Sequence, residues 1–263
     1  MNGGLSLRAV LRRTFGAYVE RAPSLLAAAL MLVLVIALEN TLLERSAAAA
    51  VGLVNLVLLA LFVCFVVLAA AEVYDGETRR TTREMLSSAW SVVGRLLLVS
   101  VVAGLVFGLV SSLGSVVLLV MIIGAAFAAG NNLATYVAGA LVLSIVLLVP
   151  ELYLMTVWSV FTPVVVLERP PGLRALGRSR DLVRGNGRRV LALILMLTLP
   201  LSLSVLIVEG ALHLLGGGPS LGGEMLLATL IAPMPMLAAT ALYYELRGRC
   251  TSLERTGGSS TRP

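Results

Sequence analysis

The chain has 263 residues, of which 59% are hydrophobic and only 13% are charged, and its formal net charge is +6. The mean hydropathy of +0.99 corresponds to far more apolar surface than one soluble core could bury. The composition therefore excludes a soluble globular protein and predicts an integral membrane protein.

Six apolar runs are long enough for transmembrane helices, which need about 20 residues per crossing. Their Leu, Val and Ala content, without short polar alternation, favours a helical bundle over a barrel of strands. The predicted fold class is all-α: a polytopic bundle of six transmembrane helices, with short amphipathic interfacial helices on the cytoplasmic side. The predicted spans are Ser24–Asn40, Val51–Val73, Leu96–Gly124, Leu133–Leu167, Val190–Leu212 and Glu224–Tyr244.

These runs predict one membrane domain over residues 1–249. Within it, residues 1–23 form an N-terminal interfacial helix and residues 24–246 form the six-span bundle. The remaining residues, 250–263, are rich in Gly, Ser and Thr, a composition that predicts a disordered cytoplasmic tail.

Two amphipathic helices are predicted before the third span. In the first, Ser6 can cap a helix whose apolar side chains repeat every three or four residues. We expect both helices to bury one face at the acyl boundary of the bilayer. The two apolar faces consist of Leu7, Val10, Leu11, Phe15 and Tyr18, and of Met85, Leu86, Ala89, Trp90 and Val93.

The third span carries small residues at every fourth position. Such a stripe lets a second helix approach closely. We expect helix packing here, within the chain in preference to between two copies. The stripe consists of Ser100, Gly104, Gly108 and Ser112.

The fourth apolar run contains Pro150 followed by Glu151. Proline removes a backbone hydrogen bond, so we expect this helix to be kinked or re-entrant at that point. A carboxylate inside a bilayer is costly unless it is paired or wetted, and it is a functional candidate by default. Glu151 is therefore predicted either to take part in proton, ion or substrate movement or to be a structural partner at the kink.

A basic segment separates the fourth span from the fifth. Its apolar positions, Leu173, Leu176, Ser179, Leu182 and Val183, alternate with arginines and predict a third amphipathic helix that ends at Gly185 and Asn186–Gly187. The arginines predict contact with anionic lipid headgroups, by general attraction or in a specific anion pocket. They are Arg174, Arg178, Arg180, Arg184, Arg188 and Arg189.

The distribution of arginine predicts the orientation of the chain. All 20 basic residues are arginine, and all but Arg45 fall on one side of the six predicted spans. The positive-inside rule then places both termini in the cytoplasm. For a bacterial chain this predicts a multi-pass protein of the inner membrane.

Four stretches resemble landmarks of the bacterial glycerophosphoryl diester phosphodiesterase membrane-domain family. They are SLRAVLRRTFGAYVERAPSLL, VYDGETRRTTREMLSSAWSVVGRLL, PVVVLERPPGLRALGRSRDLVRGNGRRV and ALYYELRGR. The most specific positions are Glu168, then Ala175, Leu176, Arg178, Ser179, Leu182 and Gly185, and finally Tyr243, Tyr244, Glu245, Leu246, Arg247 and Arg249. Gly187 and Glu245 depart from the family pattern, which often has an aromatic residue and usually an aspartate there.

The resemblance implies a membrane module without catalytic activity, because nothing here resembles the phosphodiesterase barrel that follows this domain in longer relatives. The chain also lacks a P-loop, a G-x-S-x-G turn and an H-E-x-x-H motif. With His213 as the only histidine, we expect no metal site, and we expect no cofactor and no nucleic-acid partner.

Two functions remain open from the sequence. The first is a non-enzymatic module that contacts anionic lipids and anchors or regulates a membrane or cytoplasmic protein partner. The second is a transporter, or a permease subunit, that moves a small solute, ion or lipid along a pathway that includes Glu151.

Overall fold

All regular structure in the described part of the chain is helical. The computed structural model describes residues 7–42, 48–76, 81–127, 133–214 and 229–257, and no strand occurs in these ranges, which confirms the all-α class. The elements are α1 (Leu7–Leu42), α2 (Ala48–Asp75), α3 (Thr82–Phe127), α4 (Leu133–Val157), α5 (Phe161–Pro163), the π-helical turn η2 (Val164–Glu168), α6 (Arg174–Val183), α7 (Gly187–Leu214) and α9 (Met234–Gly257).

Five helical stretches are long and apolar enough to cross a membrane, so the chain is a polytopic membrane protein. They are Val10–Ala37, Gly52–Asp75, Arg83–Met121, Leu148–Glu168 and Gly187–Ser204. Each overlaps one of the first five predicted spans. The sixth predicted span, Glu224–Tyr244, begins outside the described residues, and its second half falls in α9.

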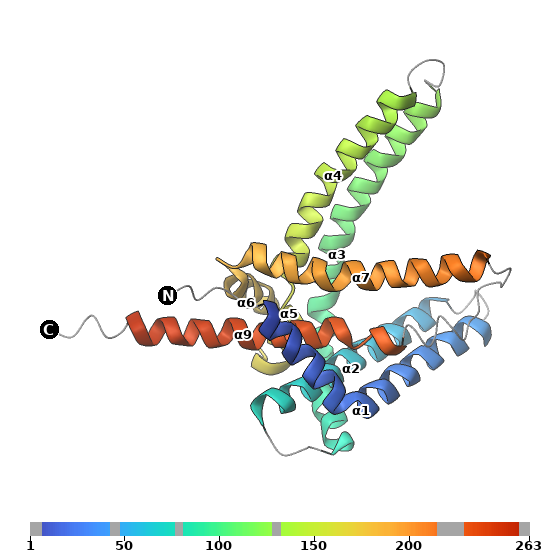
Figure 1. Ribbon diagram of the computed structural model, residues 1–263. Coiled ribbons are helices and arrows are strands. Elements are labelled where there is room, and N and C mark those ends of the chain that lie inside the picture. The colour runs from blue at the N-terminus through green and yellow to red at the C-terminus, as the bar shows by residue number, and fades with distance from the viewer. Residues whose placement is uncertain (1–6, 43–47, 77–80, 128–132, 215–228, 258–263) are drawn as a thin grey trace.

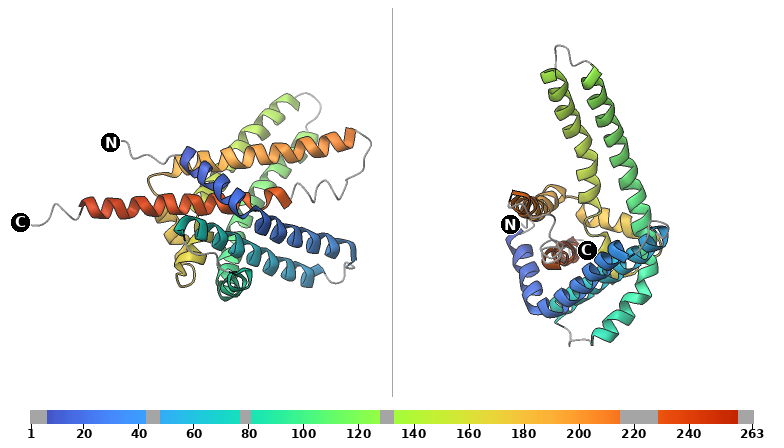
Figure 2. Two further views of the ribbon diagram at one scale, coloured as in Figure 1. Left: turned by 60° about the horizontal axis from the view of Figure 1, so that its bottom comes forward. Right: turned by 90° about the vertical axis from the view of Figure 1, so that its right-hand side faces the viewer.

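The helices form two groups with different directions (Figures 1 and 2). Helices α2, α7, α9 and the second part of α1 run roughly parallel or antiparallel to one another. Helices α3 and α4 pair with each other as a hairpin that projects steeply away from the rest. In Figure 1 the start of α7 and the end of α9 lie at one end of the molecule, and the ends of α1 and α7 lie at the other.

Two predicted pairs of elements are fused into single long helices. Helix α1 joins the first amphipathic segment to the first span over 36 residues and contains Pro23. Figure 1 shows α1 bending part of the way along, as expected when a proline removes a hydrogen bond to the preceding turn. Helix α3 joins the second amphipathic segment to the third span over 46 residues. At 1.5 Å per residue its length is about 69 Å, more than twice the ~30 Å thickness of the hydrocarbon core.

The faces that these two helices bury differ from the predicted stripes. In the amphipathic segment at the start of α1, Val10, Thr14 and Ala17 are buried, whereas Phe15 is 52% exposed. Periodicity identified an apolar face without identifying what covers it. The small residues of α1 pack on α9 and α2, which leaves the larger ring of Phe15 outside.

The same correction applies to the start of α3. Met85, Ala89 and Val93 are buried as predicted and are joined by Val92, but Trp90 is 65% exposed and Leu86 also faces outward. The buried side of this segment packs against α2 and η2, so protein and not the acyl boundary covers it.

The break in the fourth apolar run falls later than predicted. Helix α4 continues through Pro150 and ends at Val157, and a turn at Trp158–Val160 precedes α5. Pro163 explains this position, because a proline ring clashes with the carbonyl four residues earlier, here that of Ser159. Helix α4 is therefore not broken at Pro150, and the break in this run lies ahead of Pro163.

The C-terminal helix is also longer than predicted. Residues 250–257, expected to start the disordered tail, are the last two turns of α9. Leu253, Glu254 and Arg255 are good helix formers, which favours this continuation.

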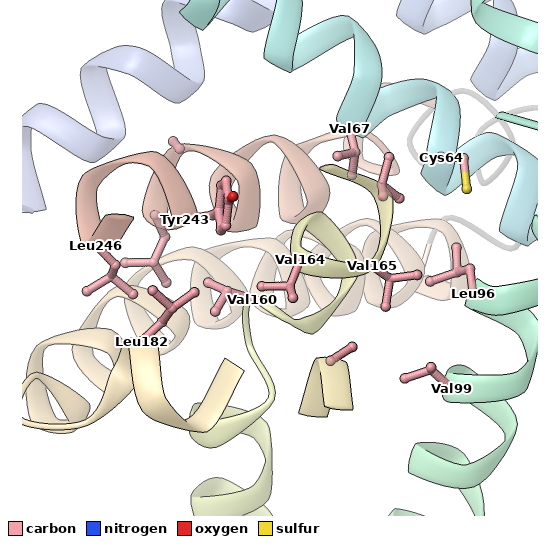
Figure 3. Close-up of a cluster of buried hydrophobic side chains, with 14 of the residues drawn as sticks. Cys64, Val67, Leu96, Val99, Val160, Val164, Val165, Leu182, Tyr243 and Leu246 are labelled. Atoms are coloured by element: carbon pink, nitrogen blue, oxygen red, sulfur yellow. The ribbon is translucent and has the colours of Figure 1, made fainter. Parts of the chain in front are cut away.

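The main core lies where α2, α9, η2, α6 and the beginnings of α3 and α7 meet (Figure 3). Figure 3 shows Leu246 of α9 beside Leu182 of α6, with Val160 from the turn after α4 and Val164 from the start of η2. Tyr243 and Leu246 are both buried in this cluster. The core therefore fixes α6, which carries much of the basic segment, against α9.

We expect Leu246→Ala to lower the free energy of unfolding by about 2–5 kcal/mol, because it leaves a cavity in this core. Leu105→Ala is the control, since Leu105 is 69% exposed on the projecting hairpin. Thermal unfolding of both variants in the same detergent gives the comparison. Equal destabilisation by the two substitutions would contradict the described packing.

Candidate functional site

The Glu168 carboxylate joins α6 to α9. The Tyr243 hydroxyl donates a hydrogen bond to Oε1 of Glu168 at 3.0 Å. Arg178 donates from Nε to Oε2 at 3.2 Å and forms an ion pair with it. Arg247 donates to the Tyr243 hydroxyl at 3.2 Å, and its guanidinium lies 5.9 Å from the centre of the Tyr243 ring. We call Glu168, Tyr243, Arg178 and Arg247 the glutamate clamp.

Backbone geometry places the clamp glutamate at the end of η2. The next residue, Arg169, has a φ of +52°, which is uncommon for a residue other than glycine. Its carbonyl accepts a hydrogen bond from Arg95 of α3 at 3.4 Å. Pro170 and Pro171 follow, then Gly172 with a φ of +54°, and the chain turns into α6. The turn directs α6 back across the molecule beside Glu168.

Helix α6 is held on its other side by Ser179. This serine is fully buried, and its hydroxyl donates to the carbonyl of Val157 at 2.8 Å. That carbonyl belongs to the last turn of α4, whose acceptors have no partner within the helix. Ser179 therefore satisfies a helix end and ties α6 to α4.

A cavity of about 870 Å³ opens between α4, α6 and the start of α7. Three of the predicted arginines, Arg180, Arg184 and Arg188, line it, together with Asp181. Its opposite wall is mainly apolar and comes from α4, through Val149, Leu152, Tyr153, Thr156 and Val157. We call this cavity the arginine pocket.

The turn between α6 and α7 brings the three arginines together. As the sequence predicted, α6 ends before Gly185, which has a φ of +85°, a left-handed conformation that glycine adopts without steric cost. Arg180 lies before this turn and Arg188 after it. None of the three guanidinium groups has a hydrogen-bond or ion-pair partner among the described residues.

The six arginines of the predicted site divide into three sets. Arg178 belongs to the glutamate clamp, and Arg174 and Arg189 are exposed but do not line the pocket. Only Arg180, Arg184 and Arg188 share one cavity. Within this segment, the arginines placed to share one anion are therefore these three and not all six.

Glu151 makes a contact between helices. Its Oε1 accepts a hydrogen bond from the Ser111 hydroxyl of α3 at 2.6 Å, which joins the two helices of the projecting hairpin. Glu151 lines neither the arginine pocket nor the mostly apolar cavity between α3 and α9. The predicted role of Glu151 in transport stays a prediction, and the contact accords with the structural alternative.

The small-residue stripe of α3 lies partly beside a second cavity. Ser100 and Gly104 line a mostly apolar cavity of about 470 Å³ between α3, α4, α5, α7 and α9. A Cβ atom on Gly104 or Gly108 would meet nothing within 4 Å, so no described helix packs tightly there. Ser112 bonds back to the carbonyl of Leu109 in its own helix.

A second set of polar contacts, which sequence reasoning missed, holds α1 and α2 to each other and to α9. Arg21 of α1 forms a buried ion pair with Glu72 of α2. The Tyr244 hydroxyl donates to Oδ2 of Asp75 at 2.8 Å. Arg13 pairs with Glu245 at 3.4 Å. Adjacent residues of α9 thus contact different elements: Tyr243 contacts η2, and Tyr244 contacts α2. The sequence signal for these contacts was the run Tyr243, Tyr244 and Glu245, which belongs to the family resemblance.

Fold and site together define a polytopic helical membrane protein with a basic pocket at the end where α6 meets α7. The model of one family, described as a domain of unknown function (DUF8558), matches residues 19–242, so the chain belongs to that family. Neither the curated proteins nor the solved structures contain a match. The resemblance to the phosphodiesterase membrane-domain family stays a prediction.

We expect Tyr243→Phe to destabilise the protein by about 1–3 kcal/mol, because the Glu168 carboxylate and the Arg247 guanidinium each lose a buried partner. Tyr153→Phe is the matched control, since its side chain is 56% exposed and its hydroxyl has no described partner. Chemical or thermal unfolding in detergent measures the difference. If both substitutions have the same small effect, the clamp does not stabilise the fold.

Proposed function

We propose that this protein is a non-enzymatic membrane module that binds anionic phospholipid headgroups in the arginine pocket, at the cytoplasmic leaflet of the inner membrane. The observation that supports this most strongly is the set of three unpartnered guanidinium groups, those of Arg180, Arg184 and Arg188, around one cavity. Guanidinium groups bind phosphate in planar, often bidentate geometry.

The contrast with Arg178 supports the same proposal. A nearby carboxylate, that of Glu168, forms an ion pair with Arg178. Arg180, Arg184 and Arg188 have no such partner within the described residues. Each arginine close to an anionic membrane surface contributes about 1 kcal/mol of attraction. Three of them around one cavity can act on the same phosphate.

The apolar wall of the pocket favours a lipid over a soluble anion. Val149 and Tyr153 of α4 are exposed large side chains beside the arginines, and the exposed surface of α4 continues through Val146 along the hairpin. An acyl chain can lie on this surface while its headgroup meets the arginines. The lining residues include no histidine, cysteine or serine that would suggest covalent chemistry.

The orientation expected from the arginine distribution agrees with this proposal. The positive-inside rule assigns the arginine-rich end of the chain to the cytoplasmic side. The cytoplasmic leaflet carries a negative surface potential from its anionic lipids. The pocket would then face the leaflet with the matching charge.

The test compares two double variants with the same change in net charge. Arg180→Gln with Arg184→Gln removes two pocket arginines, and Arg174→Gln with Arg189→Gln removes two arginines outside it. We expect the first pair to weaken binding of phosphatidylglycerol by about tenfold or more, as the loss of two charge-assisted contacts implies. The second pair should weaken it by less than about threefold, the share of general attraction.

Binding can be measured by native mass spectrometry of the full chain in detergent, with phosphatidylcholine as the uncharged reference lipid. Equal losses in the two double variants would show that the arginines act only as a diffuse positive surface. That result would overturn the proposed pocket.

A further inference from the structure

Asp181 is an acidic residue inside the basic pocket. It follows Arg180 on α6, lies one turn before Arg184 and lines the same cavity. Its carboxylate is exposed and has no hydrogen-bond or ion-pair partner among the described residues, although three arginines line the pocket with it. A site that binds only phosphate gains nothing from such a group, because a carboxylate repels a second anion.

A carboxylate accepts hydrogen bonds and donates none. Its natural ligands are therefore hydroxyl or ammonium groups. Three arginines and one aspartate give the pocket a net formal charge of +2. This balance disfavours a lipid whose headgroup has no net charge, such as phosphatidylethanolamine, and leaves a hydroxyl as the better donor to Asp181.

The pocket has room for a headgroup larger than phosphate. Gly177, Gly185 and Gly187 line it, and a Cβ atom on any of them would meet nothing within 4 Å. The volume of about 870 Å³ falls in the range of small-molecule sites, roughly 300–1,000 Å³. A phosphate bound by the arginines leaves space for a polyol beside Asp181.

We infer that the pocket selects an anionic phospholipid whose headgroup carries free hydroxyls next to the phosphodiester, as in phosphatidylglycerol. This rests on the proposed function. The guanidinium groups of Arg180, Arg184 and Arg188 bind the phosphate. The Asp181 carboxylate accepts hydrogen bonds from the headgroup hydroxyls, and the acyl chain lies along the α4 wall. Phosphatidate, which has the same chains and no hydroxylated headgroup, binds less well.

The test is a competition between phosphatidylglycerol and phosphatidate of identical acyl chains, mixed in equal amounts with the full chain in detergent and read by native mass spectrometry. We expect the unchanged protein to favour phosphatidylglycerol by about three- to tenfold, the equivalent of one or two net hydrogen bonds. Asp181→Asn should bring the ratio close to one, mainly by binding more phosphatidate.

Glu20→Gln is the matched control, because Glu20 is an exposed acid on α1 outside the pocket. It removes the same charge and should keep the original ratio. Deacylated glycerophosphoglycerol serves as the soluble source of the same headgroup, and we expect it to bind more than tenfold less tightly than the lipid, since it makes no contact with the apolar wall.

Three results would overturn the inference: a ratio near one in the unchanged protein, a ratio that Asp181→Asn leaves unchanged, or stronger binding of phosphatidylethanolamine than of phosphatidylglycerol. Equal binding of the deacylated headgroup would overturn the assignment to a lipid. The proposed function fails separately, when neither anionic lipid binds better than phosphatidylcholine. If Asp181→Asn leaves the ratio of phosphatidylglycerol to phosphatidate unchanged but both lipids bind better than phosphatidylcholine, the inference about Asp181 fails and the proposed function stands.

Discussion

The way in which α6 lies against α9 depends on the carboxylate of Glu168. It accepts hydrogen bonds from Tyr243 of α9 and from Arg178 of α6, two helices that lie far apart in the sequence. Because a partly buried carboxylate needs partners, this contact restricts how α6 can lie against α9. Ser179 adds a second restraint by bonding to the end of α4. The position of the arginine pocket follows from these two restraints.

The clamp also explains why the basic segment is not uniform. Arg178 points to the side of α6 that faces Glu168, whereas Arg180 and Arg184 lie on the side that faces α4. The turn at Gly185 then adds Arg188 from α7. A stretch that reads as one run of positive charge therefore contains one structural cation, three pocket cations and two exposed cations outside both.

Much of the fold could be predicted from the sequence, because apolar length and helix signals are local. The helical class, the first five spans and the end of α6 before Gly185 all follow from such signals. The buried faces of α1 and α3 could not be predicted, since periodicity identifies an apolar side but not whether lipid or protein covers it. Phe15 and Trp90 lie outside for that reason.

The site was predicted less completely, for a different physical reason. The contact between Glu168 and Tyr243 joins residues 75 positions apart, and no pattern in either segment specifies its partner. Charge alone grouped six arginines, and only three-dimensional packing separates Arg178 from Arg180. The break ahead of Pro163, and not at Pro150, also depends on how the turn after α4 packs into the core.

The most direct measurement is a crystal structure of the full chain grown from a lipidic mesophase that contains phosphatidylglycerol. We expect a lipid phosphate within hydrogen-bond distance of Arg180, Arg184 and Arg188, with an acyl chain along α4 and the Glu168 clamp intact. A structure in which lipid phosphates contact only Arg174 and Arg189, or in which the pocket arginines pair with carboxylates of the chain, would contradict it.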